Sequence, residues 1–352
     1  MTSPGPAPLT AWRPLVAPFE QPDARRSTIQ VVTTLGALVG GVYATYRTLA
    51  LPYAVTLLCA LVTAGFLMRT FMLMHDCAHG SLFTSRRANE VLGFITGVLT
   101  LTPFVQWRRD HVLHHASSGD LDRRGHGDVL TLTVREYLDR SRWGRFRYRL
   151  YRHPLVLLGL GPLHLAVGQR YRPRSRATGD KEIASVLRTN VALAALVAGC
   201  SLVVGFRAVM LVYVPVFFFA GAAGIWLFYV QHQFDGTHWE SHDEWDYARA
   251  ALDGSSYLRL PRLLQWLTCS IGLHHVHHLS PRVPNYRLQA CLDGNPELQQ
   301  ATRVTLRDSL RAFSLKLWDE EAGRLVGFAA AREPVASAAS TRAEPRSMME
   351  AV

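Results

Sequence analysis

The residues of this chain that could do chemistry are histidines, and they are gathered in short clusters. The segment 271–286, which reads IGLHHVHHLSPRVPNY, carries four histidines in five positions. If it is helical, His274, His277 and His278 share one face, because residues three and four apart are neighbours on a helix. Packed neutral imidazoles leave ring nitrogens without partners unless a metal binds them. The cluster therefore indicates a metal site, whereas one buried histidine would indicate only a satisfied core residue.

Similar clusters lie upstream. The segment HVLHH at 111–115 repeats the spacing, and HDCAH at 75–79 places two histidines four residues apart. The second pattern is common by chance, but here it ends a long apolar run, where polar residues tend to face a functional cavity. His232 ends another apolar run, and its neighbours Gln231 and Gln233 are expected to hydrogen-bond nearby ligands. The predicted metal ligands are His75, His79, His111, His114, His115, His232, His274, His277 and His278.

The number of histidines bears on the kind of metal. Nine imidazoles exceed the four ligands of one tetrahedral zinc and suit two metals of higher coordination number. Imidazole binds zinc, copper, iron and nickel, so spacing alone does not choose the metal. The HExxH pattern of zinc proteases is absent from the sequence. A metal pair at the mouth of a membrane bundle would suit oxidative attack on an apolar substrate by iron. The other histidines fall outside ligand spacing: His126, His153, His164, His238, His242 and His275.

The composition indicates a protein that is partly in the membrane. Of its 352 residues 49% are hydrophobic, and the mean hydropathy is +0.06, which is apolar for a soluble enzyme and polar for a chain buried wholly in lipid. The net charge of +11 fits nucleic-acid binding or arginine-rich cytoplasmic loops, and the apolar runs favour the loops, so we expect no nucleic-acid partner. The five scattered cysteines suggest neither a disulfide framework nor a thiolate site.

Four apolar runs of about 20 residues are long enough to cross a bilayer. They form two closely spaced pairs, which predict two helical hairpins, and their approximate ranges are 29–49, 51–74, 186–206 and 208–230. Four crossings return the chain to its starting side, so all histidine clusters face one compartment, and the arginine excess identifies that compartment as the cytoplasm. We therefore predict an all-α integral membrane protein with four transmembrane helices in two hairpins, interfacial helices and a cytoplasmic histidine-rich cap.

The remaining segments are shorter or more polar. Two apolar segments are short for a straight crossing: 91–107 is predicted to lie in the interface or to re-enter, and 154–167 to be interfacial or buried. The basic segment 116–152 is predicted to be mostly a solvated cytoplasmic face, and 288–328 to form one or two polar helices. We expect one domain over residues 27–328, a flexible cytoplasmic arm over 1–26 and a disordered tail over 329–352.

The clusters also resemble those of a known family. HDCAH, HVLHH and HHVHH look like the three histidine boxes of the membrane fatty acid desaturases. The segments SGDLDRRGHGDVLTLTVREY, FYVQHQF and HHLSPRVPNYRLQ resemble bacterial and cyanobacterial acyl-lipid desaturases of the delta-12 (omega-6) and delta-5 types. The resemblance covers most of residues 74–289, and the motifs are very specific as a set.

The resemblance implies a non-haem di-iron enzyme that uses dioxygen and two electrons to insert a cis double bond into an acyl chain, usually of a membrane lipid. It maps the nine histidines onto the metal ligands, places the enzyme in a bacterial inner membrane and implies an external electron donor such as ferredoxin. Two departures concern the surroundings of the site: Asp120 stands where asparagine is expected, and Gly236-Thr237-His238 where an acidic residue, threonine and an aromatic residue are expected.

Two other classes stay open. A related membrane di-iron hydroxylase or ketolase would share the histidine boxes but would add oxygen to its substrate. A metal-binding transporter or a membrane scaffold is the non-enzymatic alternative. Transporters place their polar ligands near the bilayer midplane, whereas these clusters lie at helix ends and in loops.

Overall fold

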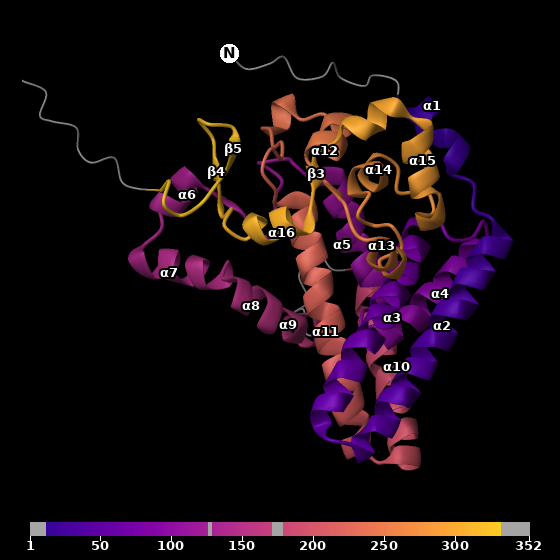
Figure 1. The fold of residues 1–352 in the computed structure, drawn as a ribbon. Helices are drawn as coiled ribbons and strands as arrows, with labels where there is room; N and C mark the ends of the chain where they lie inside the picture. The colour runs from indigo at the N-terminus through magenta and orange to yellow at the C-terminus, as the bar shows by residue number, and fades with distance from the viewer. Residues whose placement is uncertain (1–11, 126–128, 171–178, 332–352) are drawn as a thin grey trace, which may run out of the picture.

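Four long helices form the stem of the molecule. A computed structural model describes residues 12–125, 129–170 and 179–331. Four of its helices are long and apolar enough to cross a membrane. They form the two predicted hairpins and point away from the rest of the chain in Figure 1: α2 (Ala24–Arg47), α3 (Tyr53–His79), α10 (Asp180–Val204) and α11 (Phe206–His232). The prediction of four spans in two hairpins is thereby confirmed.

The stem is held together mainly where α2, α3 and α11 meet. Leu38, Ala60 and Leu67 pack against Val216 and Ala220 in one buried cluster. Small residues at such a contact let helix backbones approach closely, which favours helix association in lipid. The turn between α2 and α3 contains the short 3-10 helix η2 (Thr48–Ala50). The stem therefore holds the ends of α3 and α11 close together on one side.

The segment between the hairpins begins with two helices that meet at a sharp bend. Helices α4 (Arg86–Leu99) and α5 (Phe104–Ser117) are inclined to each other by 101°. Gly97 permits the bend, because a Cβ atom there would lie 2.6 Å from the carbonyl oxygen of Thr102. This is the geometry of a broken span or a re-entrant loop, and re-entry is one of the two arrangements expected for residues 91–107. The bend directs α5 under the histidine-rich cap.

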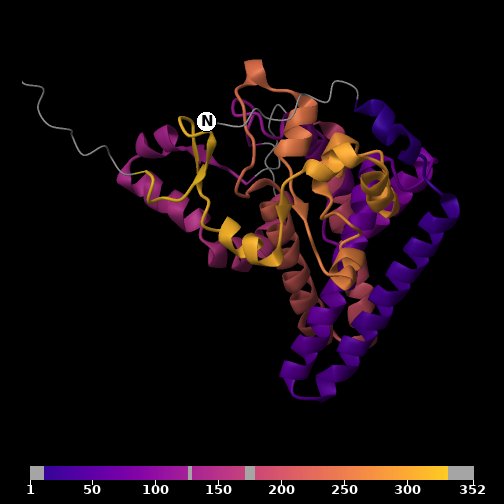
Figure 2. The ribbon, with the colours of Figure 1, turned by 45° about the horizontal axis from the view of Figure 1, so that its top comes forward.

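An arm of short helices follows and leads back to α11. After β1 (Leu132–Thr133) and α6 (Val134–Leu138), helix α7 (Arg142–Tyr151) runs toward the stem. The predicted interfacial segment 154–167 forms α8 (Pro154–Gly159) and α9 (Gly161–Val167), which contact α11, and the 3-10 helix η3 (Gly168–Arg170) follows. In both views the α6–α7 end of this arm projects away from the four long helices (Figures 1 and 2).

The rest of the described chain covers the end of the stem as a cap. Its helices are α12 (Tyr247–Asp253), α13 (Arg262–Leu267), α14 (His274–Leu279), α15 (Leu288–Gly294) and α16 (Leu306–Ala312), with the 3-10 helices η4 (His242–Glu244), η5 (Asn285–Arg287) and η6 (Pro296–Gln300). Its strands are β2 (Tyr257–Leu258), β3 (Arg303–Val304), β4 (Leu317–Asp319) and β5 (Arg324–Val326).

Two small sheets in the cap differ from the expectation for residues 288–328. Strand β4 pairs in parallel with β1 and antiparallel with β5, and β2 pairs in parallel with β3. The segment thus contains two short helices and three strands rather than polar helices alone. Strands of two or three residues are too short for alternation to show in a sequence. The three-stranded sheet joins the cap to β1 at the start of the arm, and the two-stranded sheet lies within the cap.

The N-terminal segment also differs from the expected flexible arm. Residues 12–26 include α1 (Arg13–Val16), the 3-10 helix η1 (Ala17–Phe19) and the start of α2. Val16 is fully buried in a cluster with Val276 and Leu279 of α14. This part of the chain packs on the histidine-bearing helix because it carries apolar residues among its prolines. Residues 1–11 and 332–352 lie outside the described residues, so the expectations for both ends of the chain remain predictions there.

Candidate metal centre

All nine predicted histidines come together where the stem meets the cap. His75 and His79 occupy the last turns of α3, which ends at Gly80, a residue with a left-handed φ of 68° that favours glycine. His232 is the last residue of α11. The other six come from α5 and α14, and all nine side chains are buried except that of His79, which is partly buried.

The nine side chains divide into two groups. One ligand atom from each histidine lies within 4.8 Å of those of the other members of its group. The first group is His75, His79, His111, His115 and His277, and the second is His114, His232, His274 and His278. Together they contain every predicted ligand. The structure thus holds two places where imidazole nitrogens converge.

Each box with three histidines contributes to both groups. His277 and His278 are adjacent in α14 but belong to different groups, and so do His114 and His115 in α5. The expectation that three histidines of a box act on one face is therefore incomplete. Members four residues apart, such as His111 with His115 and His274 with His278, stay together, whereas members three residues apart, such as His111 and His114, belong to different groups. The third histidine of each box, His114 in α5 and His277 in α14, is adjacent in sequence to a member of the other group and lies about 100° from it around the helix.

The distances between ring nitrogens fit metal coordination better than hydrogen bonding. The Nε2 atom of His232 lies 3.1 Å from Nε2 of His114 and 3.0 Å from Nε2 of His274. One imidazole nitrogen has either one hydrogen or one lone pair, so it cannot satisfy two such partners along straight hydrogen bonds. Ligands about 2.1 Å from a metal and about 90° apart would lie roughly 3.0 Å from each other. The second group has this spacing.

The first group repeats the arrangement around another shared nitrogen. The Nε2 atom of His115 lies 3.2 Å from Nε2 of His111 and 3.1 Å from Nε2 of His277. Buried ring nitrogens without a hydrogen-bond partner occur in both groups, namely Nε2 of His79 and Nε2 of His278. Buried polar atoms are normally satisfied, so these atoms also fit a bound metal.

Burial keeps the cap histidines in the form that binds metals. Desolvation, followed by the neighbouring imidazoles, lowers the pKa of His277 and His278 well below the ordinary value. Both rings are therefore neutral at pH 7 and can offer a lone pair. A cluster of neutral imidazoles would suit a divalent transition metal.

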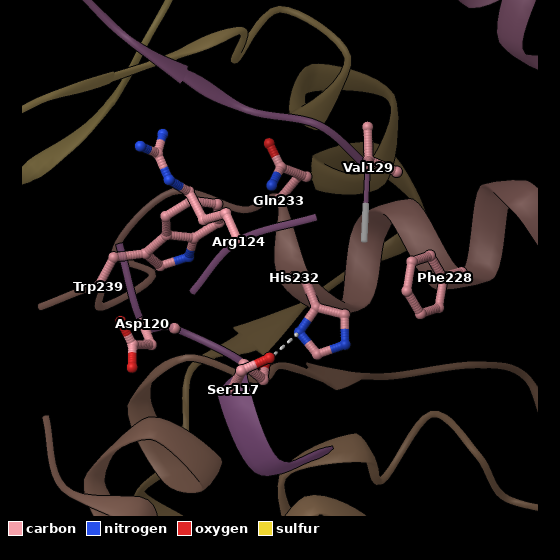
Figure 3. A pocket seen from close by; sticks show the side chains of 10 residues that line it. Ser117, Asp120, Arg124, Val129, Phe228, His232, Gln233 and Trp239 are labelled. Atoms are coloured by element: carbon pink, nitrogen blue, oxygen red, sulfur yellow. Dashed lines mark hydrogen bonds between the residues drawn. The ribbon is translucent and has the colours of Figure 1, made fainter. Parts of the chain in front are cut away.

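The surroundings of His232 determine which of its nitrogens faces the group. Its Nδ1 atom lies 3.4 Å from the carbonyl oxygen of Gly254 and 3.5 Å from the hydroxyl of Ser118. Figure 3 shows the ring of His232 among the residues that line the neighbouring pocket, with Phe228 to one side. A carbonyl oxygen can only accept, so Nδ1 carries the hydrogen and Nε2 keeps its lone pair for the second group. The ring lies beside Phe228 at the wall of a pocket of about 10 Å³, which is room for one water-sized molecule.

A buried polar chain holds His75 in a similar way. Its Nδ1 atom donates to the carboxylate of Asp76 at 3.2 Å. Asp76 also accepts hydrogen bonds from the backbone and side chain of Asn285 at 2.9 and 2.8 Å, and Asn285 is paired with Gln30 of α2. A carboxylate behind a histidine fixes the ring and raises its basicity as a ligand. None of these three residues was predicted to support the ligands, although each is a polar residue in an apolar or proline-bounded stretch, which is the signal the sequence offers.

Gln231 and Gln233 do not play the part expected of them. Gln231 donates to the carbonyl oxygen of Ile271 at 2.9 Å. Gln233 accepts from Arg152 at 2.9 Å and from Thr131 at 3.3 Å. The two side chains therefore tie the end of α11 to the cap and to the arm. The Nδ1 atom of His232 hydrogen-bonds instead to the carbonyl oxygen of Gly254 and the hydroxyl of Ser118.

The remaining described histidines lie outside both groups, as their spacing predicted. His275 is buried and its Nε2 atom bonds to the carbonyl oxygen of Leu298 at 3.0 Å. His153 is exposed and caps α8 by accepting from the backbone N–H of Leu155. His242 contacts the carboxylate of Asp120, while His126 lies outside the described residues.

Comparison with known proteins agrees with this geometry. Residues 49–308 match the sequence model of the fatty acid desaturases, which is well over half of the chain. The chain belongs to the fatty acid desaturase family. The resemblance carried by the histidine boxes is thereby confirmed, and as a member of this family the protein is an oxidoreductase.

Individual relatives extend the match over most of the chain. A fatty acid desaturase of Bacillus subtilis is 43% identical over 316 residues, which cover 90% of this chain and 89% of that protein. An sn-1 acyl-lipid omega-3 desaturase (ferredoxin) of Synechocystis is 28% identical over 70% of this chain and 69% of that protein. An endoplasmic-reticulum omega-3 fatty acid desaturase of Vigna radiata is 30% identical over 62% of this chain and 58% of that longer protein.

Asp120, which stands where the family resemblance leads us to expect asparagine, has a structural role of its own. This fully buried carboxylate accepts from Arg123 at 2.5 Å and from His242 at 2.9 Å, and it closes the turn after α5 by accepting from backbone N–H groups. Burial raises the pKa of Asp120, but hydrogen bonds from Arg123 and His242 outweigh it, so the pKa lies below the ordinary value. The second departure includes His238, whose Nε2 contacts Glu240 at 3.1 Å. Both departures lie outside the two groups.

Proposed function

We propose that this protein is a membrane acyl-lipid desaturase that inserts a cis double bond into a saturated segment of an acyl chain. The observation that carries the proposal is the pair of buried groups of five and four histidines at the end of an apolar stem. In the reaction, –CH2–CH2– with O2, two electrons and two protons becomes –CH=CH– and two waters. The acyl chain would reach the site from the bilayer that surrounds the stem.

We infer that the two groups hold an iron pair, with all nine histidines as ligands. When bound, the irons would supply the oxidising power for removing hydrogen from an unactivated alkyl chain, with dioxygen as co-substrate. The residues of the chain keep the ligands ready. Asp76 and Gly254 hold His75 and His232 in one tautomer, and burial keeps His277 and His278 neutral. The packed cap keeps bulk water away from the rings.

The electrons would come from a separate donor, for which we propose a ferredoxin-like protein. Support comes from the Synechocystis relative, whose name includes ferredoxin, and from the net charge of +11, which suits an acidic partner. We further propose that the protein lies in a bacterial inner membrane, with the histidines and both termini on the cytoplasmic side. Residues 27–328 would form a single desaturase domain.

The activity is best tested in a host whose lipids are saturated. Expression of the chain should yield a new unsaturated acyl chain, whose double bond can be located by mass spectrometry of the extracted lipids. Formation should require dioxygen. A product with an added oxygen atom would identify a hydroxylase or ketolase instead, and unchanged lipids despite accumulation of the iron-loaded protein would contradict the proposal.

The metal can be tested separately by elemental analysis of protein made in iron-rich medium. We expect about two irons per chain, in line with the number of histidine groups. Overexpression can load zinc, because zinc binds such sites more tightly than ferrous iron. Active protein that contains a single zinc would contradict the assignment.

A further inference from the structure

Helix α7 carries an apolar stripe on the side that faces away from the protein. Trp143, Phe146 and Leu150 follow the spacing of one helix face, and their exposed fractions are 65%, 51% and 50%. Trp143 and Phe146 stack with ring centroids 5.2 Å apart. The opposite face is anchored, because Tyr148 is buried and donates to the carbonyl oxygen of Lys316 at 2.8 Å. No described residue buries the stripe.

Arginines flank the stripe. At about 100° per residue, Arg142 and Arg149 fall on one side of it and Arg147 on the other. Arg149 is held at the protein surface by Tyr137, whereas Arg142 and Arg147 are exposed and have no ion pair with a described residue. The sequence contains no aspartate or glutamate between residues 140 and 179. The positive charge beside the stripe is therefore not neutralised by its own segment.

The contacts of the arm with α11 show the level at which α7 lies. Gly161 of α9 faces Ile225, and Leu157 of α8 packs in one cluster with Leu227 and Val230. Arg152, just beyond α7, donates to Gln233 at 2.9 Å. From Gly161 back to Arg152 the arm therefore rises along α11 by roughly 12 Å, at about 1.5 Å per residue. The C-terminal end of α7, next to Arg152, thus lies where the fourth span ends. In Figure 1, α7 joins α8 and α9, which run beside α11, and the end of the apolar span in α11 is the level at which a membrane surface is expected.

We propose that α7 is an interfacial helix that binds the headgroups of anionic phospholipids at this surface. The apolar stripe would enter the boundary between headgroups and acyl chains, and Arg142 and Arg147 would extend to phosphates on either side. An acidic protein partner would also suit the arginines. The lipid is favoured because an uncovered stripe of Trp, Phe and Leu between arginines, at the level of a span end, matches the bilayer boundary in both polarity and position.

The binding can be measured on the full-length protein without turnover, so the test is independent of the proposed reaction. Protein in a neutral detergent is titrated with dioleoylphosphatidylglycerol or dioleoylphosphatidylcholine, and bound lipids are counted by native mass spectrometry. The double variant Arg142→Gln/Arg147→Gln should lose the preference for phosphatidylglycerol. At about fivefold per arginine, the loss in affinity should be about 25-fold. The matched control is Arg13→Gln/Arg324→Gln, which removes two exposed arginines that lie outside α7 and should keep the preference.

A second measurement does not depend on the charge variants. Brominated phosphatidylglycerol should quench part of the tryptophan fluorescence of the wild-type protein, and Trp143→Phe should remove that part. The proposal is overturned if phosphatidylglycerol shows no preference, if the control loses as much affinity as the α7 variant, or if Trp143→Phe leaves quenching unchanged. It is also overturned if the α7 variant keeps its lipid but binds an acidic ferredoxin more weakly, because α7 would then be a protein-docking surface.

Discussion

Two neighbouring residues at the end of α11 belong to two different buried regions. His232 faces the two histidine groups, which we name the histidine centre, and Gln233 accepts from Arg152. We name Arg152 and its hydrogen-bond partners the Arg152 node. Arg152 is fully buried and donates to six neutral oxygens, those of Leu130, Thr131, Tyr148, Tyr229, Gln233 and Leu315. The histidine centre concentrates groups for chemistry, whereas the node joins the arm, the stem and the C-terminal part of the cap.

The two regions differ in how far apart their members lie along the chain. Within a histidine box the members are three or four residues apart, and that spacing repeats. The partners of Arg152 on α11 and beyond lie 77 to 163 residues away. A repeated short spacing is visible in a sequence, whereas one arginine in a basic segment looks like its solvated neighbours. Metal ligands that lie in histidine boxes can thus be predicted from the sequence, whereas the long-range contacts that hold the boxes in place cannot.

The largest expected effect concerns His232, which belongs to no box. His232→Ala removes a nitrogen that two others approach within about 3 Å, so we expect no detectable desaturated product and a lower iron content, with normal accumulation in membranes. His153→Asn is the control, because asparagine preserves the helix cap and His153 lies outside both groups. Near-normal product and iron in His232→Ala would show that the boxes alone form the site.

The second largest effect is expected at Asp76, whose carboxylate hydrogen-bonds to the predicted ligand His75. Asp76→Asn keeps the size of the side chain but removes the carboxylate that accepts from His75 and Asn285. We expect iron affinity or activity to fall about 10- to 100-fold, which is the usual cost of losing such a partner. Iron retention during dialysis against a chelator would measure the loss directly. The exposed Asp139→Asn should behave as wild type, and equal iron retention in both variants would refute the role of Asp76.

The sequence was enough to predict the helices that span the membrane and the histidines of the site, but not how those histidines are grouped and supported. Four spans could be predicted because each is a long apolar run, and all nine histidines of the centre because their spacing repeats or, for His232, because it ends such a run. The division of His277 and His278 between two groups could not be predicted, since it depends on how α5 and α14 meet. The same holds for Gly254 and Ser118, whose contacts with His232 depend on the path of loops. The burial of Val16 was missed because its segment is rich in proline.

A smaller effect is expected at the Arg152 node. Arg152→Met would leave several buried oxygens without a donor, each costing about 1–3 kcal/mol before relaxation, so we expect a loss of roughly 3–5 kcal/mol in the free energy of unfolding. Activity per folded, iron-loaded molecule should fall much less than in His232→Ala. Thermal denaturation in a neutral detergent would measure the loss, with the exposed Arg147→Met as the matched control. Equal melting temperatures for both variants would show that the node does not stabilise the protein.

The smallest effect concerns Lys316, a second buried cation beside the node. Its ammonium group donates to the carbonyl oxygen of Arg152. Burial, and then the charge of Arg152, lowers the pKa of Lys316 from 10.5 to about 8. In the unfolded chain the ordinary value returns, so between pH 8 and 10.5 the unfolded state binds more protons than the folded state. The free energy of unfolding therefore rises with pH through this window, by at most about 3 kcal/mol.

Lys316→Met should abolish this rise. We expect the melting temperature of the wild-type protein to increase, relative to that of Lys316→Met, as the pH is raised from about 8 to about 10. Other groups titrate in the same range, but they are common to both proteins, so the difference between the two curves isolates Lys316. Because this residue contacts the backbone of Arg152 and no member of the histidine centre, the iron content should not change along the same series. If the melting temperatures of the wild-type protein and Lys316→Met change equally with pH, Lys316 is hydrated in solution. If only the variant loses iron as the pH changes, the node and the histidine centre are coupled through Gln233 and His232.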